Sequence, residues 1–212
     1  MDKTTEELLE ILKSSSLEAY LKNNDDELIK NPLSNYLNAL LDEKNLKKAS
    51  TLIHRVLKEL NRPVFGFETK KEEQLEDSIR GCPIYIYDAG KPHIRTPENL
   101  IGYHKEGDVP AITAAFDRYA PSLMGPIPEN TVVELDEIGF LDAKSDAFCQ
   151  AVLHLLEGKN PVIAAVKNRE HPFLDAVRNH PNARCFYITA ENRDALYEEV
   201  LAFMKQQLEE CP

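Results

Sequence analysis

The sequence has few glycines, and its first 65 residues contain none. Eight glycines occur among 212 residues, and the first of them is Gly66. Loops that bind phosphate through several backbone N–H groups depend on glycine, because a side chain at those positions would keep the backbone away from the anion. The sequence therefore excludes a glycine-rich phosphate loop upstream of Gly66.

Cysteine pairs, excess positive charge and long hydrophobic runs are also missing. The four cysteines stand far apart without a C-x-x-C pair, which excludes a zinc knuckle or a dithiol redox motif built from neighbouring residues. The formal net charge of -11 opposes binding to nucleic acid or to an anionic membrane. No run approaches the roughly 18 apolar residues of a membrane span. We therefore expect a cytoplasmic protein without a nucleic-acid or membrane partner.

The residues that are present divide into two regions at about residue 48. Residues 1–48 repeat leucine at helical spacing and contain seven lysines, no arginine and ten acidic residues, which predicts a helical segment that does not bind DNA. A further helix is predicted from Ala49 to Leu60. Beyond it, short β-rich runs alternate with helical patterns, so we assign residues 49–212 to a second, α/β domain.

The expected sheet consists of strands that are buried on both faces. The candidate strands are Pro63–Phe67, Ile84–Tyr87, Val132–Leu135, Val162–Val166 and Arg184–Thr189. The candidate helices between and after them cover roughly residues 109–120, 145–157, 172–179 and 191–208. This alternation predicts a three-layer α/β/α fold with a mainly parallel sheet, preceded by the N-terminal helices.

Two adjacent carboxylates close the third candidate strand. In TVVELDEIGF, residues 131–140, the hydrophobic run ends at Asp136 and Glu137, at the carboxyl edge of the sheet where open α/β folds bind ligands. Asp136 is a candidate Mg²⁺ ligand, and Glu137 is a candidate general base that orients an attacking water in phosphoryl transfer. The alternative is a solvated strand end, because charged residues commonly follow strands.

A second strand end carries the sequence TAENRD. Thr189 or Asn192 can cap the helix that follows, which explains these residue types locally. Arg193 is not explained in this way, because a cation is unfavourable near a helix N-terminus. We therefore consider Arg193 the first candidate for contact with a phosphate or a base, followed by Arg169 and Lys167.

Several segments between Ser50 and the end of the chain carry a family pattern. They are STLIHRVLKEL followed by PVFGFETK, then VVELDEIG, KNPVIAAVKNREHPFLDAVRNHP and, most specifically, YITAENRDALYEEV. With these segments the chain resembles the bacterial and archaeal nucleoside-triphosphatase family, P-loop proteins of the additional-strand class. The resemblance implies Mg²⁺-dependent hydrolysis of nucleoside triphosphates. It also implies metal contact by Asp136, general-base catalysis by Glu137, and a place beside the nucleotide for the segment with Asn192 and Arg193.

The resemblance stops where this family places its phosphate loop, G-x-x-x-x-G-K-[ST]. Aligning Ser50 with the last position of the motif puts Ala49 at the lysine, Lys48 at the second glycine and Glu43 at the first. We therefore predict that an unrelated helical segment replaces the phosphate loop and the first strand. Lys48, Ser50 and Thr51, at the start of a helix, remain candidates for attracting an anion.

Three functions remain open from the sequence. The first is a degenerate nucleoside-triphosphatase-like protein in which nucleotide binding and hydrolysis are weak or lost. The second is an active Mg²⁺-dependent nucleoside triphosphate hydrolase, in which Lys48 or its neighbour Lys47 would hold phosphate. The third is an interaction module, in which residues 1–45 bind a protein partner or a second copy of the chain.

Overall fold

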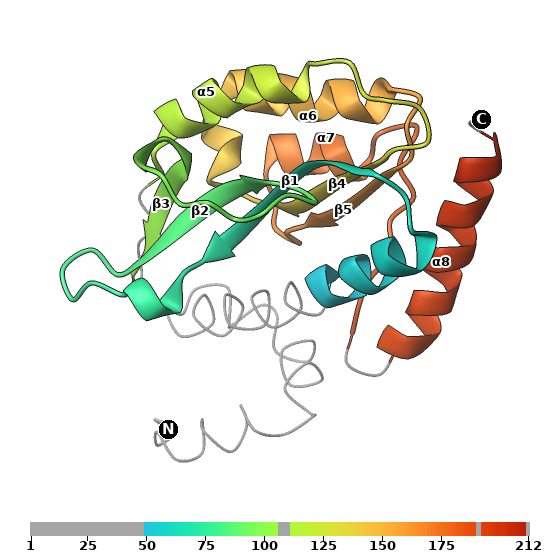
Figure 1. Cartoon of the computed structure of the whole chain (residues 1–212), viewed down its shortest axis with the longest axis horizontal. Helices are drawn as coiled ribbons and strands as arrows, with labels where there is room; N and C mark the ends of the chain where they lie inside the picture. Colours follow the sequence, from blue (N-terminus) through green and yellow to red (C-terminus); the bar gives the residue numbers. More distant parts are fainter. Residues whose placement is uncertain (1–48, 106–110, 190–191, 211–212) are drawn as a thin grey trace, which may run out of the picture. The chain divides into compact units, whose positions relative to one another are not determined.

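The computed structural model describes residues 49–105, 111–189 and 192–210. The chain divides into two units, Met1–Leu41 and Asp42–Pro212, and every element given below belongs to the second unit (Figure 1). The predictions for residues 1–48 lie outside the described residues. They include the interaction module at residues 1–45 and the phosphate contact by Lys48.

Five strands form one mixed sheet. They are β1 (Val64–Lys71), β2 (Cys82–Asp88), β3 (Leu100–His104), β4 (Val132–Ile138) and β5 (Val162–Val166), and their order across the sheet is β3-β2-β1-β4-β5. β1, β4 and β5 run parallel, whereas β2 pairs antiparallel with β1, and β3 pairs antiparallel with β2. In the register of β1 and β4, Gly66 pairs with Glu134, and Glu68 pairs with Asp136.

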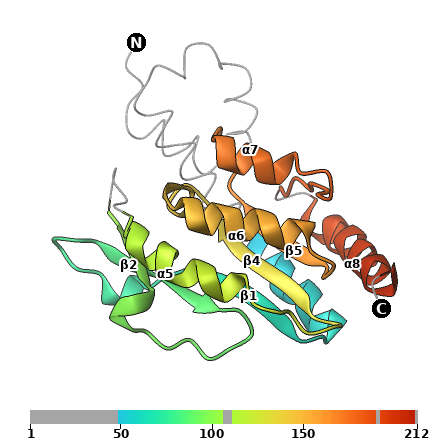
Figure 2. The same ribbon diagram turned by 90° about the horizontal axis from the view of Figure 1, so that it is seen from above.

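Helices cover both faces of the sheet, as Figures 1 and 2 show. One face carries α5 (Thr113–Leu123), α6 (Asp146–Glu157) and α7 (Pro172–Arg178). The other face carries α8 (Arg193–Glu210) and a helix whose described part covers residues 49–60. Three short 3-10 helices occur in the connections: η1 (Glu73–Leu75), η2 (Pro97–Asn99) and η3 (Asp142–Lys144). None of the helices in the described part of the chain combines the length and hydrophobicity that a membrane crossing requires.

Local sequence signals explain where two of these helices begin. Ser145 caps α6, because its hydroxyl accepts a hydrogen bond of 3.2 Å from Phe148 N–H. His171 caps α7 through Nδ1, which accepts a hydrogen bond of 3.2 Å from Phe173 N–H, and Pro172 follows at the first helical position. Both helices therefore start where a side-chain acceptor satisfies a backbone N–H that has no partner within the helix.

Each face of the sheet has its own hydrophobic core. Val133 and Leu135 of β4 belong to the core under α5, α6 and α7. Val132 belongs to the second core, under α8 and the helix at residues 49–60. Because side chains alternate along a strand, Glu134 and Asp136 point to the same face as Val132. Beneath the helix at residues 49–60, the hydrophobic core thus gives way to carboxylates.

The predicted three-layer α/β fold class is confirmed. Four of the five candidate strands and all the candidate helices after residue 60 occur near their predicted positions. The strand β3 was not predicted, and neither was the direction of β2, which runs antiparallel to its two neighbours β1 and β3. The direction of a strand depends on the neighbour with which it pairs, and the local sequence does not encode that neighbour.

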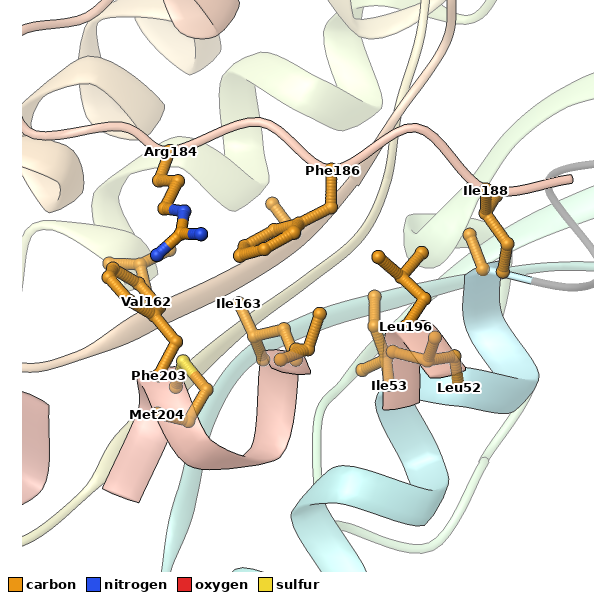
Figure 3. Close-up of a pocket in the computed structure, with 13 residues that line it drawn as sticks. Leu52, Ile53, Val162, Ile163, Arg184, Phe186, Ile188, Leu196, Phe203 and Met204 are labelled. Atoms are coloured by element: carbon orange, nitrogen blue, oxygen red, sulfur yellow. The ribbon is translucent and has the colours of Figure 1, made fainter. Parts of the chain in front are cut away.

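The predicted strand Arg184–Thr189 is wrong, because the segment has no strand assignment. A cavity of about 130 Å³ is lined both by this segment and by β5, mostly with hydrophobic side chains but also with Arg184 (Figure 3). Phe186 and Ile188 contribute to its wall, together with Leu52 and Ile53 of the helix at residues 49–60. Within the described residues, no strand beyond β5 offers this segment a backbone ladder, and a strand needs one.

Candidate functional site at the carboxyl end of β4

The end of β4 lies next to the start of the helix at residues 49–60. Asp136 is buried there, with 5% of its surface exposed. Its Oδ1 accepts a hydrogen bond of 2.8 Å from Ser50 Oγ, although the two residues are 86 positions apart in the chain. The fold therefore brings together a predicted metal ligand and the serine that aligns with the end of the phosphate-loop motif.

The surroundings of Asp136 favour a nearby positive charge. Burial raises the pKa of Asp136 from 3.8 to about 7. The hydrogen bond from Ser50 lowers this pKa, whereas the negative charges of Glu137 and Glu134 raise it further. A cation bound beside Asp136 would compensate both the burial and the repulsion between these carboxylates.

Glu137 is more open to solvent than Asp136 and is paired with a lysine. Lys167 Nζ lies 2.9 Å from Glu137 Oε1, and the Glu137 side chain is 27% exposed. Lys167 N–H also donates a hydrogen bond of 2.9 Å to the backbone oxygen of Ile138, which ties the end of β5 to the end of β4. On the other side, Glu137 N–H donates to Thr69 Oγ1 at 3.3 Å. Glu137 is thus held on two sides and remains accessible to water.

A second charged cluster lies on the same face of the sheet, around His54. His54 Nε2 is 3.3 Å from Glu68 Oε2 and 3.4 Å from Glu134 Oε1. Only 8% of Glu68 and 2% of Glu134 is exposed. The contact with Glu134, and after it the contact with Glu68, raises the pKa of His54 to about 10, against the effect of its partial burial. The contact with His54 in turn lowers the pKa of Glu68 to about 2.

A buried acid, Asp142, holds the loop that follows Glu137. Gly139 N–H donates to Asp142 Oδ1 at 2.9 Å and to Oδ2 at 3.2 Å. Burial raises the pKa of Asp142 to about 8, although the hydrogen bond from Gly139 lowers it. Because Gly139 comes two residues after Glu137, Asp142 fixes the direction in which the chain leaves the site.

Asp142 is expected to make the stability of the fold depend on pH. Its pKa is about 8 in the folded state and 3.8 as an ordinary carboxyl, so between these values the folded state binds more protons, and the free energy of unfolding falls as pH rises. We expect Asp142→Asn to reduce this slope by up to about 1.4 kcal/mol per pH unit. Urea denaturation between about pH 5 and pH 7 measures the slope. Asp146→Asn, at an exposed acid of the same region, should leave the slope unchanged. Equal slopes in Asp142→Asn and in the unchanged protein would contradict the role given to Asp142.

Asn192 and Arg193 lie at the start of α8, and their polar contacts are with neighbours in sequence. Thr189 N–H donates to Asn192 Oδ1 at 2.7 Å, and Asn192 N–H donates to Thr189 Oγ1 at 3.3 Å. This is the local capping role that the sequence also allowed. Arg193 Nε lies 3.6 Å from Asp194 Oδ1. The contacts described for Asn192 and Arg193 do not connect them to Asp136.

Lys167 forms an ion pair with Glu137, the second residue of the acidic pair. Its Nζ lies 4.9 Å from the centre of the Phe140 ring, and the guanidinium of Arg169 lies 5.6 Å from the same ring. Arg169 therefore lies near the site, with its guanidinium over the Phe140 ring. Thr51, next to Ser50, is exposed.

Four residues of the two clusters were not predicted as site residues: His54, Glu68, Glu134 and Asp142. The sequence did contain a signal for Glu134, because it stands two positions before Asp136 in a strand and so shares its face. His54 and Glu68 carried no such signal, since each belongs to a different element and meets the site only through the tertiary fold. Asp142 contacts Gly139, only three positions before it, and was not singled out by a motif.

The donor atoms at the end of β4 fit a magnesium ion. Mg²⁺ binds hard oxygen ligands, commonly one or two protein oxygens together with water and phosphate. Ser50 Oγ and the carboxylate of Asp136 are two such ligands in contact. A helix start with a hydroxyl, beside an aspartate at the end of a parallel strand of a three-layer sheet, is typical of the P-loop NTPase class.

Comparison with known proteins agrees with this class. A family model described as NTPase matches residues 47–201. "Nucleoside-triphosphatase THEP1" of Aquifex aeolicus is 25% identical over 171 residues, which cover 74% of this chain and 93% of that protein. The protein of the same name from Thermotoga petrophila is 30% identical over 84 residues, or 40% of this chain and 47% of the relative. The protein of this name from Methanopyrus kandleri is 33% identical over 97 residues, which cover 45% of this chain and 54% of the relative. In the last two matches the chain spans about half the length of the relative.

Two solved structures share the fold. The crystal structure of THEP1 from Aquifex aeolicus has a TM-score of 0.52 at 24% identity and covers 73% of this chain and 91% of that one. The solution structure of a human cancer-related nucleoside triphosphatase has a TM-score of 0.54 at 21% identity. The match covers 74% of this chain and 92% of that one. Since the family model covers most of the chain, the protein belongs to the NTPase family. The family resemblance found in the sequence is thereby confirmed.

Proposed function

We propose that this protein hydrolyses nucleoside triphosphates to the diphosphate and phosphate at the carboxyl end of β4. The observation that supports this proposal is the 2.8 Å hydrogen bond between Ser50 Oγ and Asp136 Oδ1. In P-loop hydrolases, a serine or threonine hydroxyl at a helix start and an aspartate at a strand end hold Mg²⁺ together. Ser50 and Asp136 offer the same chemical groups in the same structural places. The names of the relatives support the same activity.

Four residues carry the proposed reaction. Ser50 and Asp136 would hold Mg²⁺, which when bound supplies neutralisation of the phosphate oxygens. Glu137 accepts a hydrogen bond from the attacking water and takes its proton, because its carboxylate lies at the open end of the strand. Lys167 orients Glu137 through the 2.9 Å ion pair and adds positive charge beside the site of reaction.

The second candidate function is nucleotide binding with little or no turnover. It is favoured by the absence of glycine before Gly66 and by Ala49 at the position that aligns with the phosphate lysine. Without a loop of converging amides, a helix start offers fewer N–H donors to the phosphates, so binding would be weaker. In either case we propose that the nucleotide is contacted by Lys48, Thr51, Arg169, Asn192 and Arg193.

Calorimetric titration with Mg·ATP and Mg·GTP, combined with phosphate release from the same sample, separates the two candidates. Hydrolysis at this site should require Mg²⁺, and Ser50→Ala should lower it about tenfold or more, because the hydroxyl contacts a charged group. Ser122→Ala is the matched control, since Ser122 Oγ donates only to Tyr119 of its own helix, at 2.7 Å. Binding without phosphate release would favour the second candidate. Neither heat nor phosphate would reject both.

A further inference from the structure

His54, Glu68 and Glu134 are not used by the proposed hydrolysis, although histidine and glutamate are metal-binding residue types. Candidate ligand atoms of His54, Glu134 and Asp136 all lie within 4.8 Å of one another. His54 comes from the helix at residues 49–60, and the two carboxylates come from β4. The cluster therefore joins two elements of the fold, and Glu68 of β1 adjoins it through His54.

Glu134 has a buried oxygen that accepts no hydrogen bond from the described part of the chain. Its Oε1 is shielded from solvent and has no hydrogen-bond partner among the residues that the structure describes. The side-chain cation next to it within the described residues is His54, with Nε2 at 3.4 Å. A buried carboxylate oxygen is costly unless a donor or a cation satisfies it. Glu68 has Lys70 at 3.3 Å in addition to His54, so the shortage of positive charge lies at Glu134 and Asp136.

We propose that His54, Glu134 and Asp136 bind a divalent first-row metal ion of the Zn²⁺ type, which accepts both imidazole nitrogen and carboxylate oxygen. The ion takes the place of the proton on His54 Nε2, which is released to solvent, because only the neutral imidazole is a ligand. A tetrahedral ion with bonds of about 2.0–2.1 Å holds its ligand atoms about 3.4 Å apart. His54 Nε2 and Glu134 Oε1 are 3.4 Å apart, so this pair has the required spacing. The His54 side chain is 47% exposed, so the cluster is open to solvent on the side of the imidazole.

The proposed ion would fasten the helix at residues 49–60 to β4. His54 lies one helical turn after Ser50, so a metal on His54 would also hold Ser50 beside Asp136. The site shares Asp136 with the proposed magnesium site, but it does not depend on hydrolysis. Mg²⁺ is a poor occupant, because it takes oxygen ligands and gives up its waters reluctantly.

Thermal unfolding of the full chain without nucleotide, with Zn²⁺ or with chelator, tests this site directly. A Cys185→Ser background removes an exposed thiol that could bind Zn²⁺ by itself. Free Zn²⁺ at about 100 times its Kd should raise the midpoint by about 5–10 °C. His54→Gln and Glu134→Gln should each weaken Zn²⁺ binding, measured by calorimetry, at least about tenfold. Because His54 is exposed, His54→Gln should fold, and it therefore tests the site even if Glu134→Gln impairs folding.

His93→Gln is the matched control for the assignment of His54. His93 Nε2 also lies 3.4 Å from Glu68, but His93 is not one of the three proposed ligands. This variant should therefore bind Zn²⁺ as the unchanged protein does. The proposal is overturned by the absence of a Zn²⁺ shift, by a shift that persists in both ligand variants, or by an equal loss in His93→Gln. An equal shift with Mg²⁺ would also overturn it, because it would place the ion at the oxygen ligands alone. None of these outcomes requires or excludes hydrolysis.

Discussion

Glu137→Gln is expected to lower the rate of phosphate release from Mg·ATP by about 10²- to 10⁴-fold, the usual contribution of a general base. Glutamine keeps the size of glutamate and one acceptor oxygen, but it cannot take the proton of the attacking water. Nucleotide binding should change little, because Ser50 and Asp136 keep their 2.8 Å contact. Calorimetry and phosphate release on the same sample separate the loss of turnover from a loss of binding.

Loss of the ion pair with Lys167 is the competing explanation for such an effect. Lys167→Met removes the same 2.9 Å contact but leaves the carboxylate of Glu137 in place. If Glu137 is the base, its substitution should slow the reaction far more than Lys167→Met does. Equal losses would instead assign Glu137 an orienting role. Glu170→Gln, at an exposed acid close in sequence to Lys167, controls for the change in net charge. A rate for Glu137→Gln within about threefold of the unchanged protein would contradict its role as base.

Burial patterns explain why the sequence predicted most of the sheet and where the prediction failed. β4 is buried on both faces, so its hydrophobic run is visible without any knowledge of its neighbours. β3 is only five residues long and has Gly102 at its centre, which weakens a local strand pattern. Arg184–Thr189 shows the opposite case, because it has the composition of a strand but no ladder partner in the described residues. Local sequence indicates which segments can be strands, and pairing decides which of them are.

The sequence predicted some residues of the site, but it did not predict which residues contact one another there. Asp136 stood out because it closes a hydrophobic strand, and Ser50 stood out because it aligns with the last position of a family motif. Their contact spans 86 residues, and no spacing rule connects positions so far apart. Glu134 shares a face with Asp136, but His54 and Glu68 meet it only through the packing of a helix and the register of β1 on β4.

Gly66 is the residue on which this register depends most directly. It pairs with Glu134 across β1 and β4 and has a φ of 122°, a conformation that residues with a side chain rarely adopt. A Cβ added to Gly66 would lie 2.0 Å from the backbone oxygen of Glu134. Because this neighbour is backbone, no rotation of a side chain can relieve the clash. The strands themselves would have to move apart.

Gly66→Ala is therefore expected to lower the free energy of unfolding by at least about 3 kcal/mol, through backbone strain and the displaced pairing of β1 with β4. Urea denaturation should show unfolding at a lower urea concentration, with an unchanged dependence of the free energy of unfolding on urea concentration. Gly125→Ala is the matched control, because its added Cβ would lie 3.7 Å from Ser122 O, an ordinary contact, and should change stability by no more than about 0.5 kcal/mol. If Gly66→Ala were as stable as Gly125→Ala, then β1 and β4 could not be paired in this register. The grouping of Glu68 with Glu134 around His54 would fail with it, because that grouping depends on the same alignment of the two strands.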